Sequence, residues 1–190
     1  MWDDEAKPKK AKVLRKITPQ RLKNIALYYL KRFESSVENL RTVLQKRVND
    51  YAYQNPEFNK YEAYEWIEEI LTQFEGYGYL NDERYAEIKI RDYLAAGKSA
   101  RYIKGKLQLK GIKEEAIDRL LFEQDYDPAE LALKLAKKKR IGPFRPDEAS
   151  RLANRQKDLR SLVAAGFDYG IAQQVLGIEF DEAETDIPLG

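Results

Sequence analysis

Hydrophobic residues in the second half of the chain recur in two closely matched sets. In each set, a helical run of apolar residues ends at a glycine, which is followed by a hydrophobic residue and a further helical run. The first set is Leu107, Gly111, Ile112, Ala116, Leu120 and Leu121, and the second, fifty-five residues later, is Leu162, Gly166, Phe167, Ile171, Val175 and Leu176. Glycine is the usual residue just after a helix C-terminus. Because one such helix pair cannot bury its apolar face alone, the recurrence predicts a stack of similar helical units.

Helical spacing also covers the first part of the chain. Its clearest stripe is Ala63, Trp66, Ile67, Ile70, Leu71 and Phe74, which we expect to be core residues. Residues 49–60 have no apolar period and are predicted to form a loop. At an offset of sixty-three residues, Ser36 matches Ser99, Leu40 matches Ile103 and Leu44 matches Leu107. In the last copy, Asp158 stands where the middle copy has Ile103, so the repeat predicts a common architecture and not three identical surfaces.

The pattern predicts an all-α protein of three tandem three-helix units, which would form an elongated, curved body. Thr18-Pro19 and Asp127-Pro128 each combine an N-cap with proline at the first helical position. The predicted divisions are a flexible basic arm (1–17), a first unit (18–80), a second unit (81–125), a third unit (126–178) and an acidic tail (179–190). Since no apolar run reaches about 18 residues and the N-terminus is charged, we expect a cytoplasmic protein without membrane contact.

Composition removes most classes of enzyme. The 190 residues are 43% hydrophobic and 35% charged, which is enough for a core and for solvated helix faces. The chain has no cysteine and no histidine, which excludes disulfides, catalytic triads and nearly all zinc sites. Adjacent carboxylates such as Glu114 and Glu115 splay around a helix and do not converge on a metal ion. We therefore expect no catalytic activity, no cofactor and no metal site.

Charges are segregated along the chain although the net charge is only +2. Residues 98–113 contain six bases and no acid, and residues 134–160 contain ten bases and three acids. By contrast, residues 61–75 and 179–186 carry only acidic charges. The basic segments are suited to a polyanion, whereas an acidic helix face with Glu62, Glu65 and Glu69 would repel DNA or meet a basic partner.

Basic residues of these two segments are the candidate contacts. Lys134 and Lys138 lie one helical turn apart with Lys137 beside them, so that three ammonium groups can face one anionic surface. The full candidate set is Arg101, Lys104, Lys106, Lys110, Lys134, Lys137, Lys138, Lys139, Arg140, Arg151, Arg155 and Arg160. The competing interpretation is that these charges only solvate the helices and complement their dipoles. Tyr93 and Tyr102 could stack on unpaired nucleotides, but we favour core packing for both.

Three motifs, in order, resemble those of the RecX family of regulatory proteins, which are bacterial modulators of the RecA recombinase. The first is GYLNDERYA at 78–86, the second runs from Gly97 and Ser99 to Gly111 and Ile112, and the third is 157–167 followed by Ile171 and Val175. Together the motifs span most of residues 20–178. Two positions depart from the family pattern, Asn81 in place of aspartate and Ala165 where arginine is frequent.

The resemblance implies three tandem three-helix units, no catalysis, and binding to RecA and to its filament on single-stranded DNA. Such binding would limit filament extension, strand exchange and ATPase activity. We expect a monomer that also makes a weak direct DNA contact. A second hypothesis is a direct DNA-binding regulator that uses residues 99–121 as a helix-turn-helix-like pair, with Gly111 at the turn. The low net charge disfavours it, and no convergent motif supports a third hypothesis, an enzyme that uses carboxylates or lysine.

Overall fold

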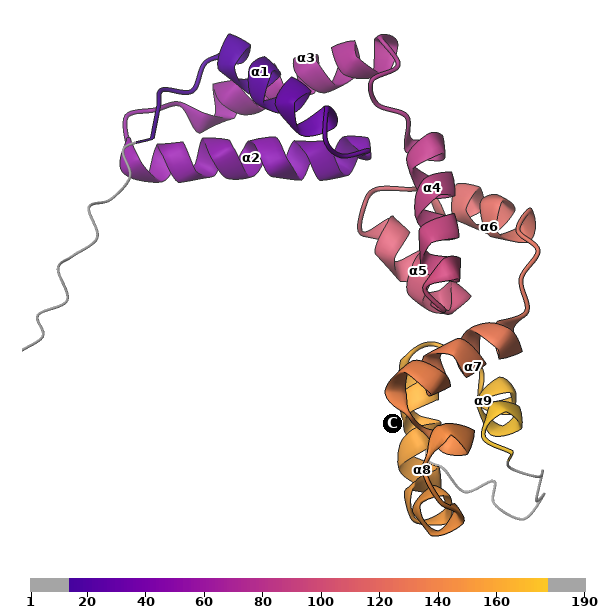
Figure 1. Ribbon diagram of the computed structural model, residues 1–190. Helices are drawn as coiled ribbons and strands as arrows, with labels where there is room; N and C mark the ends of the chain where they lie inside the picture. The colour runs from indigo at the N-terminus through magenta and orange to yellow at the C-terminus, as the bar shows by residue number, and fades with distance from the viewer. Residues whose placement is uncertain (1–13, 178–190) are drawn as a thin grey trace, which may run out of the picture. The chain divides into compact units, whose positions relative to one another are not determined.

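The computed structural model describes residues 14–177, which form nine α-helices and one short 3-10 helix, with no strand in that range (Figure 1). The helices follow one another in three groups of three. The first group is α1 (Pro19–Leu30), α2 (Val37–Gln54) and α3 (Lys60–Gly76), the second is α4 (Asp82–Ala95), α5 (Ala100–Gln108) and α6 (Glu114–Phe122), and the third is α7 (Pro128–Lys139), α8 (Glu148–Ala164) and α9 (Tyr169–Val175). The 3-10 helix η1 (Gly142–Phe144) links α7 to α8. This confirms the predicted all-α fold of tandem three-helix units, whereas the curved body stays a prediction.

The described chain divides into two compact units, one up to Leu80 and one from Asn81 onward. The first unit is α1–α3, and the second contains both α4–α6 and α7–α9. Each unit has its own hydrophobic core. In the second unit, Ile103 and Leu107 of α5 belong to the same buried cluster as Leu131 of α7 and Leu162 of α8. The predicted division at residue 126 therefore separates two helix groups within one core.

The core of the first unit is built from the predicted apolar stripes. Leu22 of α1, Leu44 of α2 and Phe74 of α3 are completely buried. Trp66, which we expected in the core, is half-buried and packs against its edge. Ile17, assigned from the sequence to the flexible arm, is only 4% exposed and belongs to this core, so that the arm cannot extend to it. Residues 1–13 of the arm and the acidic tail at 179–190 lie outside the described residues.

Local capping determines where the helices begin. Thr18 accepts a hydrogen bond from Arg21 N at 3.2 Å, and Asp127 accepts one from Ala129 N at 2.8 Å, as their sequence patterns predict. The predicted loop at 49–60 was wrong at its start, because α2 continues through Gln54. Tyr51, near the end of α2, packs edge-on against Phe58 at 5.0 Å between ring centroids, a contact that helical periodicity alone does not reveal.

None of the helices in the described range is long and apolar enough to cross a membrane.

Candidate binding surface

The C-terminal end of α7 presents four consecutive basic residues, Lys137, Lys138, Lys139 and Arg140, all exposed. The opposite side of α7 is buried in the core through four apolar residues, Leu131, Ala132, Leu135 and Ala136. This amphipathic pattern leaves Lys134 exposed as well. Cations in the last turn also interact favourably with the helix dipole. The basic residues predicted at this end of α7 therefore lie on the surface of the protein.

Arg140 ends α7 in a left-handed backbone conformation, with φ of 53° and ψ of 48°. Ile141 N donates to Ala136 O at 3.0 Å, which closes the helix in the manner usually seen with glycine at this position. Among residues 14–177, Arg140 is the one non-glycine residue with positive φ. That conformation costs an L-residue about 1–2 kcal/mol. Arg140 adopts it although glycine would do so with less strain, and the position therefore carries a positive charge.

Helix α8 carries the remaining basic candidates of the third group. Arg151, Arg155 and Arg160 are exposed along it. Lys139 Nζ donates to Ser161 Oγ at 2.8 Å, so the end of α7 lies beside the part of α8 that carries Arg160. Arg151 and Arg155 form no hydrogen bond or ion pair through their side chains with the part of the chain that the structure describes. The structure thus brings Arg160 close to the α7 cluster, whereas Arg151 and Arg155 lie nearer the start of α8.

The middle group contributes fewer available charges than the sequence suggests. Lys104 Nζ lies 2.5 Å from Asp118 Oδ1, and this hydrogen bond raises the pKa of Lys104 above its usual value. The charge of Lys104 is therefore largely compensated by α6. Arg101 and Lys106 are exposed, and Lys110 is half-buried beyond the end of α5. Arg101 and Lys106 are therefore the exposed bases on α5 itself.

Tyr93 and Tyr102 pack against each other instead of presenting two free faces. Their ring centroids are 5.7 Å apart at an interplanar angle of 82°, and both residues are half-buried. Lys98 Nζ and Lys106 Nζ lie 4.9 Å and 5.5 Å from the centroid of the Tyr102 ring. The Tyr102 ring is thus already engaged with cations. This geometry supports packing over nucleotide stacking for the pair.

A close contact joins the second and third helix groups within their common unit. Ser99 Oγ donates to Ala165 O at 2.7 Å, and it also caps α5 by accepting from Tyr102 N at 3.2 Å. Gly166 has φ of +89°, and a Cβ atom at this position would lie 2.5 Å from Ser99 Oγ and 3.1 Å from Arg101 Cβ. The repeated glycine therefore does more than end a helix, because its missing side chain allows α5 to approach the end of α8.

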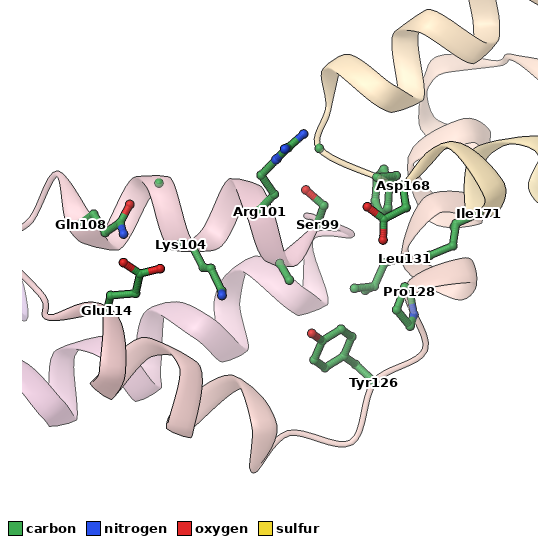
Figure 2. A pocket seen from close by; sticks show the side chains of 14 residues that line it. Ser99, Arg101, Lys104, Gln108, Glu114, Tyr126, Pro128, Leu131, Asp168 and Ile171 are labelled. Carbon is green, nitrogen blue, oxygen red and sulfur yellow. The ribbon is translucent and has the colours of Figure 1, made fainter. Parts of the chain in front are cut away.

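A pocket of about 610 Å³ opens beside this contact (Figure 2). Figure 2 shows Lys104 and Tyr126 pointing into the same space. Two basic residues of α5, Arg101 and Lys104, line it together with two acids, Glu114 and Asp168. Because two acids oppose the two bases and Lys104 is already paired with Asp118, the lining has no excess of positive charge for an anion, and the basic end of α7 remains the better candidate surface.

Arg145 and Asp158 form an ion pair that sequence reasoning did not find. Arg145 donates two hydrogen bonds to Asp158, from Nε to Oδ2 and from Nη2 to Oδ1, each at 2.7 Å. Gly142 N donates a third, to Oδ2, at 2.9 Å. Asp158 is only 1% exposed. Burial acts to raise the pKa of Asp158, but the hydrogen bonds from Arg145 and Gly142 outweigh it, so that the pKa lies below its usual value. The signal in the sequence was the aspartate at a hydrophobic position of the repeat.

This ion pair fixes the connection that follows the α7 cluster. The acceptor oxygens of Asp158 hold both Gly142, where η1 begins, and Arg145, which follows η1. Arg145 is therefore a structural base and not an available one, although it falls inside the basic segment 134–160. No group of three or more acidic residues that could hold a metal ion occurs within residues 14–177.

Comparison with known proteins places this architecture in a family. Residues 81–121, which contain α4–α6, match the family model described as the second three-helix domain of RecX. The regulatory protein RecX of Myxococcus xanthus is 38% identical over 175 residues, which cover 91% of this chain and 93% of that protein. The regulatory protein RecX of Shewanella oneidensis is 30% identical over 127 residues, covering 62% of this chain and 98% of that protein.

Solved structures share the fold. A crystal structure of a regulatory protein RecX superposes with a TM-score of 0.60 at 24% identity, over 84% of this chain and 71% of that one. The crystal structure of RecX from Lactobacillus salivarius gives a TM-score of 0.57 at 23% identity, over 84% of this chain and 94% of that one. The identity to the Myxococcus xanthus protein extends over nearly the whole length of both chains, and the three-helix motifs and the helical fold agree with it. The chain therefore belongs to the RecX family of regulatory proteins.

Proposed function

We propose that this protein regulates the RecA recombinase by binding to RecA and to RecA filaments on single-stranded DNA. In this proposal, the bound protein limits filament extension, strand exchange and ATP hydrolysis by RecA, and it catalyses no reaction of its own. Membership of the RecX family supports the regulatory role, and the resemblance of the sequence motifs supports RecA as the partner.

The exposed basic end of α7 is the observation that carries this proposal. Lys137, Lys138 and Arg140 have no ion pair with any residue in the described range, whereas the charges of Lys104 and Arg145 are compensated by Asp118 and Asp158. Uncompensated cations at the end of a helix suit a surface of phosphates or carboxylates. A RecA–DNA filament offers such groups, and attraction of this kind weakens as salt is added.

The test is a double charge reversal, Lys137→Glu with Lys138→Glu, measured by co-sedimentation with RecA on single-stranded DNA at physiological salt. We expect the wild-type protein to sediment with the filament more than with the same DNA without RecA. The variant should lose that preference and inhibit the RecA ATPase less. Thermal unfolding should be unchanged, because both side chains are exposed and surface charges contribute little to stability.

A matched control is Lys31→Glu with Lys46→Glu, which changes the net charge equally at two exposed positions of the first unit. This control should keep its preference for the filament. If it loses as much binding as the α7 variant, net charge and not the α7 surface determines docking. Equal retention of the wild-type protein on bare DNA and on the filament would contradict the proposal.

Direct readout of duplex DNA by α5 and α6 is less well supported. In a helix-turn-helix pair, residues near the N-terminus of the second helix contact the base edges. In α6 those positions are Glu114 and Glu115, both exposed. Their carboxylates would face the DNA and repel it, so we do not favour this alternative.

A further inference from the structure

The first unit contains a cationic pocket that includes none of the basic residues predicted from the sequence. Its volume is about 610 Å³. The segment before α1, residues of α1 from Gln20 to Tyr28, and the C-terminal half of α2 form its walls. Leu14 N donates to the side-chain oxygen of Gln54 at 3.4 Å, and Ile17 is buried in the core. The segment before α1 is therefore held in place as a wall of the pocket.

Three arginines and one acid line this pocket, namely Arg15, Arg21, Arg47 and Asp50. None of the three arginines forms an ion pair within the part of the chain that the structure describes. Arg21 Nε is buried and has no hydrogen-bond partner there. A buried donor without an acceptor is unusual, and no carboxylate within the described residues compensates the charge of Arg21.

Arg41, on the same helix as Arg47, shows the contrasting situation. Its guanidinium group is bound by Glu38 and by Glu68, with Nε 2.7 Å from Glu68 Oε1. The chain thus supplies carboxylates where a guanidinium group has a structural role. Around the pocket it supplies only Asp50, which leaves an excess of positive charge for an anionic ligand.

Aromatic and apolar side chains complete the pocket. Tyr28 and Tyr51 line it together with Ile25. Tyr28 is 59% exposed and has one cation, Arg32, whose guanidinium carbon lies 4.3 Å from the centroid of its ring. It differs in this from the half-buried Tyr102, which packs against Tyr93 and two lysines. Exposed tyrosine rings and guanidinium planes are surfaces on which nucleobases stack.

We propose that this pocket binds a nucleoside phosphate, taken either free from solution or as one nucleotide of a single strand. The guanidinium groups of Arg15, Arg21 and Arg47 would hold the phosphate, and the base would lie against Tyr28. Asp50 can accept a hydrogen bond from a sugar hydroxyl or a base amino group. The volume falls in the range of small-ligand sites. An acidic peptide would satisfy the arginines but would leave the Tyr28 ring without a planar partner.

The test is a nuclear magnetic resonance titration of the full-length, isotope-labelled protein without RecA. The probes are adenosine monophosphate, adenosine triphosphate and a short thymidine oligonucleotide. We expect saturable shifts of the amide signals of residues 14–28 and 47–51. Because RecA is absent, this result does not depend on the proposed function, and either proposal can fail alone.

Single-residue variants test whether the ligand binds at this pocket. Arg47→Ala should weaken binding about tenfold, which corresponds to the loss of one charge-assisted contact, and Tyr28→Ala should weaken it as well. Lys46→Ala is the matched control, because it removes the same charge from an adjacent exposed position that does not line the pocket. Asp50→Asn keeps an oxygen that can accept a hydrogen bond but removes the one negative charge of the lining, so it should bind the phosphate more tightly, an outcome that loss of folding cannot produce.

The probes separate the two sources of the nucleotide. Saturation by a free nucleotide that displaces the oligonucleotide supports a free ligand, whereas saturation by the oligonucleotide alone supports a nucleotide within a strand. The proposal is overturned if no probe binds, or if Lys46→Ala weakens binding as much as Arg47→Ala does.

Discussion

Arg140 occupies a left-handed backbone conformation that glycine adopts at lower cost. A substitution at this residue can therefore change the stability of the fold and the binding of a partner in opposite directions. We predict that Arg140→Gly raises the free energy of unfolding by about 1 kcal/mol, because the left-handed strain is relieved. The same variant should bind RecA filaments more weakly, since one exposed cation of the α7 cluster is lost. Thermal denaturation and filament co-sedimentation measure the two effects.

Arg140→Ala serves as the control for this prediction. Alanine removes the charge but keeps a side chain in the left-handed region, so binding should fall without any gain in stability. If Arg140→Gly binds filaments like the wild-type protein, the α7 surface does not include this residue.

Asp158 fills a repeat position that is completely buried and apolar in the middle copy, where Ile103 stands. We predict that Asp158→Ala lowers the free energy of unfolding by about 3 kcal/mol, because a buried charge partner is removed and Gly142 N loses its acceptor. The double variant Arg145→Met with Asp158→Ile should recover the part of this loss that comes from the unpaired Arg145, since apolar packing can replace a buried ion pair, whereas Gly142 N stays without its acceptor. Chemical denaturation of both variants tests the comparison.

The pH dependence of unfolding provides a second readout for the same pair. The pKa of Asp158 is lower in the folded protein than in the unfolded chain, where it is about 3.9. The carboxylate therefore contributes its full stabilisation above that value and loses it as the pH falls through the folded pKa. The double variant has no carboxylate at this position, so it should not show this loss of stability at acid pH. An identical acid-unfolding profile in wild type and double variant would contradict the assignment.

At the scale of the helices, Gly166 determines how closely α5 approaches the end of α8. We predict that Gly166→Ala destabilises the second unit by more than about 1 kcal/mol, because a side chain would combine left-handed strain with a clash against Ser99 Oγ. Gly105, inside α5, has open space around a Cβ position. Gly105→Ala is the control and should stabilise the helix by about 1 kcal/mol. Thermal unfolding of the two variants should shift in opposite directions.

Helix boundaries and core faces could be predicted from the sequence where the cause is local. Thr18 and Asp127 cap their helices through bonds to residues two or three positions away, so a short motif suffices. The continuation of α2 to Gln54 was missed because it depends partly on contacts such as Tyr51 with Phe58. Periodicity carries no information about such aromatic contacts across a turn.

The sequence could predict which basic residues are exposed on the candidate surface, but not which of them are already paired with a carboxylate. Exposure of Lys137 and Lys138 follows from helix geometry. The ion pair of Lys104 with Asp118 joins two helices, and Asp158 meets Arg145 across a turn. These pairings depend on how the helices pack, and a pattern of charges along the chain cannot specify them.

At the scale of the whole molecule, the two hydrophobic cores share no buried residue. Leu44 is completely buried in the first core and Leu162 in the second. We predict that Leu44→Ala, at a cost of about 3 kcal/mol, accelerates amide hydrogen exchange in α1–α3 and leaves α4–α9 unchanged. Leu162→Ala should accelerate exchange in α4–α6 as well as in α7–α9, because both groups are built on one core.

Hydrogen exchange resolved by peptide distinguishes this arrangement from three independent repeats. In a simple array of independent repeats, the effect of Leu162→Ala on hydrogen exchange would be confined to α7–α9, and exchange in α4–α6 would be unchanged. Its spread through α4–α6 would show that the contact of Ser99 with Ala165 lies inside one cooperative unit. The bases of α5 and α7 would then be held by a single folding unit, and the cationic pocket of the first unit would be stabilised separately.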